Sequence, residues 1–374
     1  MDERFDVAVI GGGPTGTGLT IALANAGRSV VVLERSFYDH VRIGETLPPR
    51  SRVLFRKLGV WDRFIKEGPA PSPAILSAWG QDDLYENHFI FNPYGHGWHI
   101  DRRRFDKMLA LVAEEAGASV RRGARVTSCL PLTSGGWEVE FTLNDARRRL
   151  RASFLVDATG RASVVARSQR SKRIFYDRLI GLVGFFSTHL PGEETDYKTL
   201  VEAAEEGWWY SAGLPNSQMV VAYMTDADLI PKGSGRMIQH WRKQLEQAPY
   251  TRSRVSDDGV PEAGLRPVAA NSYRMDRITG TNWLAVGDAA TAFDPLSSRG
   301  IYNALESGLQ AARAIERYQF SDQEALDEYE LWSQRIFKEY LRMWAIYYGR
   351  ETRWSSSTFW HRRQRKQDRP FEGL

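Results

Sequence analysis

The chain opens with apolar runs that alternate with glycine-rich and small-residue segments. An apolar run over residues 5–10 stops at the glycine-rich stretch 11–16, and small, mostly apolar residues continue to 26. Gly27 interrupts this segment, and a second apolar run ends on Glu34. Short continuous apolar runs are typical of strands buried on both faces, and glycine after a small-residue segment is typical of a helix end. The pattern therefore predicts a strand, a tight turn, a helix and a second strand.

The turn of this predicted unit reads GGGPTG. Gly11 permits the tight turn, Gly13 lets the backbone approach a pyrophosphate, and Gly16 lets helix and strand pack closely. The helix that begins here presents free N–H groups and a partial positive charge to phosphates. Glu34 follows Gly16 by 18 residues, where a carboxylate can accept hydrogen bonds from a ribose. The sequence therefore predicts a site for a ligand that contains ADP.

Two later segments repeat the pattern of an apolar strand that ends in a glycine turn. FLVDATG, over 154–160, brings Asp157 to such a turn. WLAVGDAATAFDPLSSRG, over 283–300, brings Asp288 to a strand end, and a helical pattern follows Gly300. Asp288 can accept from a ribityl hydroxyl, and the helix start offers positive potential to the isoalloxazine edge that gains negative charge on reduction. These segments indicate a flavin.

Composition limits the class of protein that this chain can be. The 374 residues carry a net charge of +4 and are 42% hydrophobic, as expected of an ordinary globular protein with about two or three domains. No apolar run reaches the roughly 18 residues of a membrane span, and the first strand begins by Phe5, which leaves no room for a signal peptide. The single cysteine, Cys129, excludes an internal disulfide and favours a structural role. We expect a cytoplasmic protein without a metal site.

Arginine is clustered at 102–104, at 147–149 and within 361–366. Such clusters can bind nucleic acid, but these fall in different predicted elements and carry no recognition motif. A solvated surface, or docking of an acidic partner, explains them better. We therefore expect no nucleic-acid binding.

Four motifs in a fixed order carry a family resemblance. GGGPTG, IDRRRFD at 100–106, DATG at 157–160 and GDAATAFDPLSSRG at 287–300 resemble the class A flavoprotein monooxygenases and the related flavin-dependent halogenases. The resemblance covers residues 5–315 and implies an α/β fold, in which a glutathione-reductase-type FAD-binding Rossmann domain holds an inserted antiparallel-sheet substrate domain and C-terminal helices follow.

The resemblance also implies which positions contact FAD. These are Gly11, Gly13, Pro14, Thr15, Gly16, Glu34 and Arg35 for the ADP part, Val126 for adenine, Arg102 for the ribityl–phosphate region, Arg42 for the loop beside the ring, Asp157 and Gly160 for the DATG turn, and Asp288, Pro295, Gly300 and Ile301 for the ribityl chain and ring.

The predicted domains are discontinuous along the chain. An amphipathic pattern with aromatic residues at helical spacing over 323–348 is typical of a core or interface face. The expected boundaries are 1–75, 101–172 and 266–315 for the FAD-binding domain, 76–100 and 173–265 for the substrate domain, and 316–374 for a helical region with a basic tail.

Three departures from the halogenases argue against halogenation. Their lysine, which carries the halogenating agent, has no counterpart over 70–80, and Lys57 and Lys66 fall in an earlier, surface helix. Ser297 stands where tryptophan halogenases carry a glutamate, and their G-W-x-W-x-I-P signature survives only as GWWYSAGLP at 207–215. Without a positioned ammonium group, a halogenating oxidant has nothing to steer it onto a substrate carbon.

Another branch of the superfamily matches better. IGETLPP, EGWWYSAGLP and DPLSSRG are similar to the flavoproteins that install oxygen on a tryptophan of a partner quinoprotein during biogenesis of cysteine tryptophylquinone. The resemblance implies an FAD-dependent monooxygenase that hydroxylates an aromatic substrate, either a protein-bound tryptophan or a small molecule, through a flavin C4a-hydroperoxide. A halogenase, an FAD oxidase or dehydrogenase, and a non-catalytic flavoprotein chaperone stay open as alternatives.

The electron donor and the catalytic base are the least determined parts. NAD(P)H that binds transiently, a separate flavin reductase or the substrate itself is the expected donor, because the chain has no second G-x-G-x-x-G. A base that activates an aromatic ring contributes roughly 10²–10⁴-fold. The candidates are Glu45 in GETLPP and His99, with His96, in YGHGWHI.

Several aromatic residues are candidates for stacking on an aromatic substrate. Trp79, Trp98 and Tyr210 are more simply explained as core residues in a chain with 12 tryptophans. Trp208 and Trp209 are adjacent on one predicted strand, so at most one of them faces the flavin.

Overall fold

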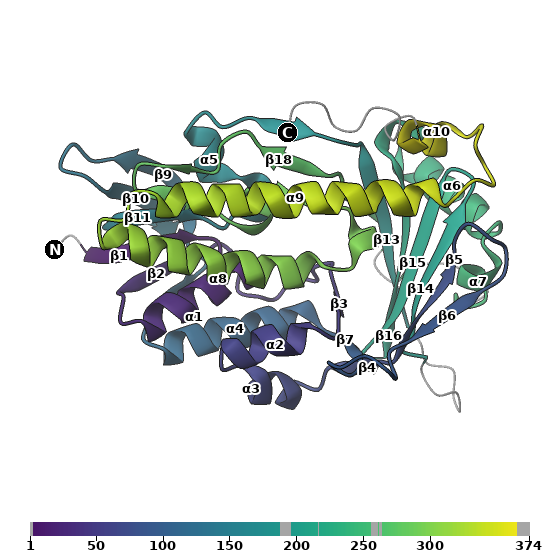
Figure 1. Cartoon of the computed structure of the whole chain (residues 1–374), viewed down its shortest axis with the longest axis horizontal. Helices are drawn as coiled ribbons and strands as arrows, with labels where there is room; N and C mark the ends of the chain where they lie inside the picture. Colours follow the sequence, from purple (N-terminus) through teal and green to yellow (C-terminus); the bar gives the residue numbers. More distant parts are fainter. Residues whose placement is uncertain (1–2, 188–195, 216, 256–260, 262–263, 365–374) are drawn as a thin grey trace.

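The computed structural model describes residues 3–187, 196–215, 217–255, 261 and 264–364. Two large sheets stand next to each other along the longest axis of the molecule, and one long helix, α9 (Ala325–Gly349), runs across both (Figure 1). The predicted fold class, a Rossmann-type α/β unit combined with an inserted antiparallel sheet and C-terminal helices, is confirmed.

The first sheet has a parallel core built from the apolar runs of the sequence. β1 (Glu3–Ile10) pairs in parallel with β2 (Val30–Glu34) and with β11 (Ala146–Asp157). Their buried side chains form part of the main hydrophobic core. Because parallel strands end at one edge, Gly11 and Glu34 are brought together there, where open α/β sheets bind ligands. The other strands are β8 (Ser119–Arg122), β9 (Arg125–Pro131), β10 (Trp137–Leu143), β19 (Thr279–Gly280) and β20 (Trp283–Ala285).

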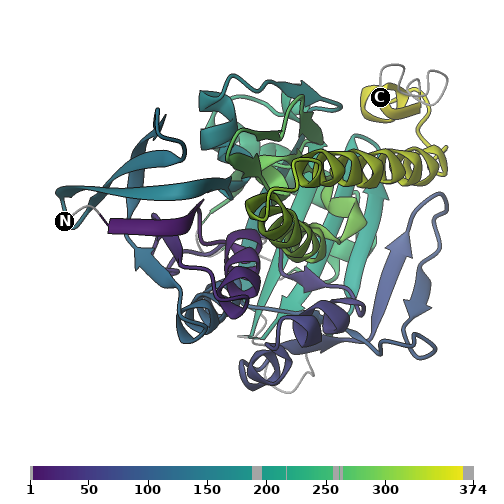
Figure 2. The ribbon, with the colours of Figure 1, turned by 60° about the vertical axis from the view of Figure 1, so that its left-hand side comes forward.

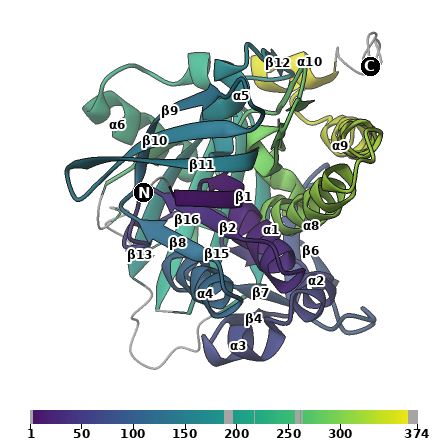
Figure 3. The same ribbon diagram turned by 90° about the vertical axis from the view of Figure 1, so that its left-hand side faces the viewer.

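Three helices cover one face of this parallel core (Figure 3). α1 (Pro14–Asn25) packs between α4 (Arg102–Glu115) and α8 (Gly300–Gln319). Gly18 and Gly308 allow α1 and α8 to approach closely, since a Cβ on Gly308 would lie 2.8 Å from the Thr15 carbonyl. The short helices α2 (Ser51–Lys57) and α3 (Trp61–Lys66) extend this layer.

The second sheet has seven strands and is antiparallel except where β14 pairs with β5. Its order is β17 (Arg266–Ala269), β13 (Leu179–Ser187), β16 (Gln218–Asp226), β15 (Gly207–Leu214), β14 (Thr199–Ala204), β5 (Ala74–Ala78) and β6 (Tyr85–His88). One face is covered by α6 (Ser234–Leu245) and α7 (Pro249–Arg252), and the other by the end of α9 and α10 (Thr358–Gln364). Figure 2 shows α9 against this sheet and the β5–β6 hairpin at its margin.

Short elements connect the two large sheets. One small sheet contains β3 (Thr46–Leu47), β7 (Gly97–His99) and β4 (Ala70–Ser72), and another contains β12 (Arg173–Phe175), β18 (Tyr273–Met275) and β21 (Thr291–Ala292). The remaining helical turns are α5 (Val164–Ser168), η1 (Gly160–Ala162), η2 (Ala227–Leu229), η3 (Gly287–Ala289) and η4 (Pro295–Ser297).

Two placements differ from the predicted domain boundaries. β17 lies in 266–315 yet pairs with β13 of the second sheet, and β12 lies in 173–265 yet pairs with β18. The exact boundaries stay a prediction, since strands cross between the two parts. Of the helices that the described residues form, none combines the length and apolar character needed to span a membrane.

Two of the three arginine clusters are more paired than a solvated surface implies, whereas 147–149 are exposed. In 102–104 each arginine has a carboxylate partner within 3.3 Å. Arg363 of the basic tail is buried and pairs with Asp226 at 2.9 Å, and Arg362 pairs with Asp226 and Asp228. Residues 365–374, with Lys366 of the tail, lie outside the described residues. The described part of the tail therefore anchors α10 rather than forming a free basic surface.

Candidate active site

The glycines of the predicted nucleotide turn have the distinct roles that the motif assigns. Gly11 has φ +103°, and a Cβ there would lie 2.3 Å from the Ala158 carbonyl oxygen. A Cβ on Gly16 would lie 2.1 Å from the Gly11 carbonyl oxygen. A Cβ on Gly13 would meet nothing within 4 Å, so open space adjoins the start of α1. Since free N–H groups of a helix start border this space, the turn fits a pyrophosphate.

Glu34 is buried at the end of β2 and holds this turn. Its carboxylate accepts from the Gly12 N–H at 2.7 Å and from the Ser36 hydroxyl at 2.6 Å, and it pairs with Arg42 at 3.2 Å. Burial alone would raise the pKa of Glu34, but the hydrogen bonds from Ser36 and Gly12 lower it overall. The carboxylate is therefore ionised and oriented, as a ribose acceptor must be. Arg35, the next residue, is exposed.

Tyr38 is a part of this end that sequence reasoning missed. It is buried with φ +63°, in the left-handed region, and its hydroxyl donates to the Gly12 carbonyl at 2.9 Å. A Cβ on Gly12 would lie 2.4 Å from that hydroxyl, so tyrosine and glycine fit each other. No spacing in the sequence points to this contact.

Arg102 and Asp106 link the two ends of the predicted cofactor site. Arg102 forms a bidentate pair with Asp106, with both distances 3.0 Å, and donates to the Ile43 carbonyl at 2.7 Å. Arg42 also contacts Asp106, at 3.2 Å. The Arg42 side chain thus contacts the Glu34 end, and its predicted place in the loop beside the ring stays a prediction. Asp106 was not among the predicted site residues, although its spacing four residues after Arg102 is a signal for an ion pair.

Glu45 is a buried carboxyl in the loop that Arg102 holds. It is 2% exposed, and Oε2 accepts from the Gly44 N–H at 3.0 Å, whereas Oε1 has no hydrogen-bond partner among the described residues. Burial raises the pKa of Glu45 to about 7, and Arg102 opposes this. A carboxyl of this kind can hold or release a proton near neutral pH. Thr46, the next residue, shares a 2.6 Å hydrogen bond with Tyr210 of β15.

The two histidines lie in different surroundings. His99 is fully buried in β7 and its Nε2 is 2.9 Å from the Thr199 hydroxyl of β14. Burial lowers the pKa of His99 to about 4, so the ring is neutral at neutral pH. His96 packs edge-on against Trp98, with ring centroids 5.1 Å apart. The structure therefore places Glu45, and neither histidine, beside Arg102.

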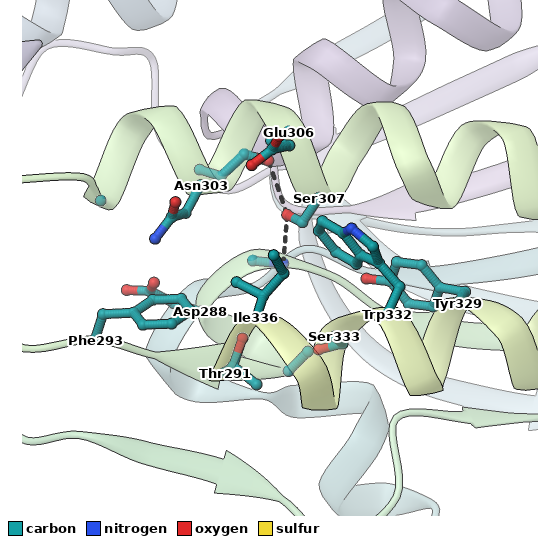
Figure 4. Close-up of a pocket in the computed structure, with 14 residues that line it drawn as sticks. Asp288, Thr291, Phe293, Asn303, Glu306, Ser307, Tyr329, Trp332, Ser333 and Ile336 are labelled. Carbon is teal, nitrogen blue, oxygen red and sulfur yellow. Dashed lines mark hydrogen bonds between the residues drawn. The ribbon is translucent and has the colours of Figure 1, made fainter. Parts of the chain in front are cut away.

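The loop after β20 brings several predicted flavin contacts together. Asp288 is 43% exposed and lies 3.6 Å from Arg161. Asp288 and Gly300 both line a narrow crevice between α8 and α9, whose cavity volume of about 10 Å³ is too small for a flavin ring (Figure 4). Ser307 of α8 closes its inner wall, where its hydroxyl accepts from the Gly287 N–H at 3.2 Å. Pro295 is exposed at the start of η4, and Ile301 is buried in the main core.

The remaining predicted cofactor residues support the turns. The Asp157 carboxylate is fully buried and accepts from Thr159 and from the Ala166 N–H, so its contribution to a ligand site is indirect. Gly160 begins η1 with φ +61°. Pro14 and Thr15 are buried in the first turn of α1. Val126 lies two residues after Ala124, whose N–H donates to the Glu34 carbonyl, so β9 passes the predicted adenine end.

The aromatic residues of β15 separate as the strand geometry predicts. Trp208 packs toward α9, whereas Trp209 packs on the opposite face against Trp241 of α6. Trp98 is a core residue, and Trp79 contacts Trp208 at 6.2 Å between ring centroids. Cys129, for which we predicted a structural role, is half-buried in β9, and burial raises its pKa to about 12.

Comparisons with known proteins agree with this geometry. Residues 4–342 match the family described as FAD binding domain. LodB of Marinomonas mediterranea, named as an FAD-dependent oxidoreductase, is 29% identical over 368 residues, which is 96% of this chain and 97% of LodB. The flavin-dependent halogenase armH4 of Armillaria mellea is 28% identical over 351 residues, which is 84% of this chain and 66% of that protein. The chain thus spans about two thirds of the length of this halogenase and nearly all of LodB.

Solved structures show the same fold. The myxobacterial chondrochloren halogenase CndH superposes with a TM-score of 0.86 at 26% identity, and the match covers 96% of this chain and 86% of CndH. QhpG, a peptidyl tryptophan dihydroxylase, superposes with a TM-score of 0.78 at 24% identity, over 96% of this chain and 79% of QhpG. At that identity the likeness to QhpG concerns the fold alone.

Proposed function

Because this chain belongs to the FAD-binding domain family and is an FAD-dependent oxidoreductase, as predicted, we propose that it is a monooxygenase that hydroxylates an electron-rich aromatic substrate. The observation that carries the proposal is the Glu45 carboxyl, buried with one unpaired oxygen beside Arg102. It is suited to take a proton from an aromatic substrate as oxygen is transferred.

The residues present fit FAD. The turn around Gly13 would hold the pyrophosphate, Glu34 the ribose, and the loop from Asp288 to Gly300 the ribityl chain and ring. Reduced FAD, when bound, supplies the activation of dioxygen. One oxygen atom enters the aromatic ring and the other leaves as water, and NAD(P)H supplies two electrons directly or through a flavin reductase.

The protein contributes positioning and proton handling. The Arg102 guanidinium holds the Gly44 loop through the Ile43 carbonyl, and the Thr46–Tyr210 hydrogen bond fixes the other side of Glu45 to β15. Glu45 is therefore held between the two large sheets. Glu45 is only 2% exposed, so little water reaches it, and this strengthens any interaction of the carboxyl with a substrate.

The side chains of the substrate region favour hydroxylation over halogenation. β4 and β5 carry no lysine, and Lys57 and Lys66 are exposed on α2 and α3. An ammonium group that would guide a halogenating agent is therefore absent from these strands. A flavin-dependent halogenase is the second candidate, because the likeness to armH4 covers 84% of this chain.

A protein-bound tryptophan is the substrate that we favour. QhpG, which is named a peptidyl tryptophan dihydroxylase, shares the fold over 96% of this chain. The turn after β6 also exposes two apolar residues, Ile90 at 76% and Phe91 at 95%. Large exposed apolar side chains side by side are typical of protein contacts. This turn precedes β7, and β7 pairs with β3, which begins directly after Glu45.

The experiment supplies isotopically labelled dioxygen to the reduced, FAD-loaded protein. Free tryptophan, a tryptophan-containing peptide, a simple phenol and a folded quinoprotein precursor serve as substrates, with and without chloride or bromide. We expect labelled oxygen in an aromatic product, and Glu45→Gln to lower its formation about 100-fold. Halogen in the product supports the halogenase. Substrate oxidation without label supports an oxidase or dehydrogenase, and an absence of any product contradicts both proposals.

Two variants test the protein substrate. Ile90→Ser together with Phe91→Ser should lower labelling of a protein substrate and leave labelling of a small aromatic unchanged. Phe320→Ser is the matched control, because Phe320 is 77% exposed at the end of α8. If the double variant at Ile90 and Phe91 and the Phe320→Ser control lower labelling of the protein substrate equally, docking at this turn is contradicted.

A further inference from the structure

The loop that follows β21 is anchored by one buried carboxylate. Asp294 is 1% exposed and directly precedes η4. Its Oδ1 accepts from the Leu296 N–H at 2.9 Å, and its Oδ2 accepts from the Tyr348 hydroxyl at 2.7 Å and from Trp344 Nε1 at 3.3 Å. Of the loop residues that follow, Pro295 and Gly300 are exposed. The loop therefore depends on Asp294 for much of its attachment to the protein.

Two tyrosines of α9 bind Asp294, one at its side-chain carboxylate and the other at its backbone N–H. The Tyr348 hydroxyl donates to the carboxylate, and the Tyr340 hydroxyl accepts from the Asp294 N–H at 3.0 Å. Tyr340, Trp344 and Tyr348 are spaced four residues apart, so they share one face of the helix. The aromatic pattern at helical spacing was predicted to be a core or interface face. In the structure this face binds Asp294 and so attaches the loop to α9.

Tyr348 also reaches the second sheet. Its hydroxyl accepts from Trp208 Nε1 of β15 at 3.0 Å while it donates to Asp294. Burial, together with Asp177, raises the pKa of Asp294 to about 6, and Arg363 opposes this. Above that pH the carboxylate is mostly ionised, and hydrogen bonds to an ionised acceptor are roughly twice as strong as neutral ones. One hydroxyl thus joins β15, α9 and the loop.

We propose that Asp294, Tyr340 and Tyr348 are positioning residues that fix the loop 295–300 beside the predicted flavin ring and couple it to the substrate sheet through Trp208. None of them needs to touch FAD. Changes in α9 or β15 then alter the surroundings of the bound flavin, and a displacement of the substrate sheet is transmitted to the loop. This inference goes beyond the proposed function and holds for a monooxygenase, a halogenase or an oxidase.

The test uses the full chain, loaded with FAD, without substrate. Tyr348→Phe keeps the ring and removes both hydrogen bonds of the hydroxyl. We expect it to weaken FAD binding about 10-fold, since a hydrogen bond to a charged group contributes on that order, and to shift the visible absorption bands of the bound flavin. Trp208→Phe should change both in the same direction by less. Tyr347→Phe is the control, because Tyr347 is 45% exposed and its hydroxyl forms no hydrogen bond among the described residues.

A merely structural role would lower the melting temperature of these variants without changing FAD affinity or the flavin spectrum, and that result would overturn the proposal. If Tyr348→Phe does not fold, Tyr340→Phe and Asp294→Asn carry the same test. Wild-type affinity and spectrum in the variants that fold would also overturn it. Because neither readout needs turnover, failure of the proposed hydroxylation leaves this test unaffected.

Discussion

The two ends of the predicted FAD site are built in different ways. The ADP end is largely local: Gly11, Gly16 and Glu34 come from one strand–helix–strand unit and meet through backbone geometry. The flavin end draws on distant segments, since its loop is held through Asp294 by α9 and β15. The ADP end recognises a part of the cofactor that never changes. The flavin end has to serve a substrate, and its supports come from the elements that surround the second sheet.

This difference explains which parts of the FAD site can be predicted from the sequence. A glycine whose Cβ would lie 2.1 Å from a carbonyl leaves no choice of residue, so a local motif carries the ADP end. A carboxyl such as Glu45 acquires its properties from burial by residues far away in sequence. Variants that disturb one end and spare the other therefore test the comparison directly.

Gly13→Asp should give the largest effect. It places a carboxylate in the open space at the start of α1, against the predicted pyrophosphate, and we expect FAD binding to be abolished. Gly13 has φ −72° and ψ −179°, which any residue can adopt, so the fold should be retained. The measurements are flavin absorbance after purification and circular dichroism.

Gly13→Ala is the matched control for this variant. It adds only a methyl group to the same space, so it should weaken FAD binding less and leave the fold unchanged. Normal flavin content in Gly13→Asp would contradict the assignment of the whole ADP end.

Arg102→Met should give the next largest effect, because Arg102 serves both ends. It leaves the buried Asp106 carboxylate with Arg42 alone, so the loss should be below the roughly 3–5 kcal/mol that an unpaired buried charge costs. Arg103→Met breaks the more exposed pair with Asp101 and should cost less than about 1 kcal/mol. Urea unfolding of both variants measures the difference. Similar losses of stability in the two variants would show that the buried Arg102–Asp106 pair stabilises the fold no more than the more exposed Arg103–Asp101 pair.

The sequence predicted the parts of the fold that follow from local rules. The parallel core and the turn at Gly11 follow from apolar runs and from steric limits on glycine. The opposite faces of Trp208 and Trp209 follow from strand geometry. Each of these rests on a few neighbouring residues, so a single sequence contains the information.

The rest depends on contacts between distant segments. Tyr38 adopts a left-handed conformation that no propensity predicts, and it fits only because Gly12 lies beneath its hydroxyl. The ion pairs of Arg42 were not predicted, because its partners, Glu34 and Asp106, come from other elements. His99 was a candidate base from its place in the chain, yet burial in β7 lowers its pKa to about 4, which makes it a weak base.

Glu45→Gln tests the flavin end through the pH dependence of stability. The pKa of Glu45 is about 7 in the folded protein and 4.5 without burial, so the folded state binds the proton more tightly. The resulting stability is fully present below pH 4.5, is lost as the pH rises to about 7, and changes no further above that. Glutamine has no charge to bury, so the variant should be more stable than the wild type by about 2–3 kcal/mol at pH 8 and nearly equal at pH 4.5. Unfolding by urea at both pH values, without FAD, measures this; an equal difference at both would contradict the burial of an ionisable carboxyl.

Arg35→Ala should give the smallest effect on FAD affinity. It tests whether a residue that the motif alone assigns to the ribose contributes to binding. The resemblance places Arg35 next to the ribose, but its side chain is exposed, whereas that of Arg42 pairs with Glu34 and Asp106. An exposed side chain contributes little, so FAD affinity should fall by no more than about 2–3-fold, which corresponds to roughly 0.5 kcal/mol. Arg42→Ala removes a partner of two buried carboxylates, and its effect on affinity should be several times larger. Titration of FAD into the two variants separates them, and a larger effect from Arg35 would mean that the cofactor is held by the exposed rim of the ADP end rather than by its buried carboxylates.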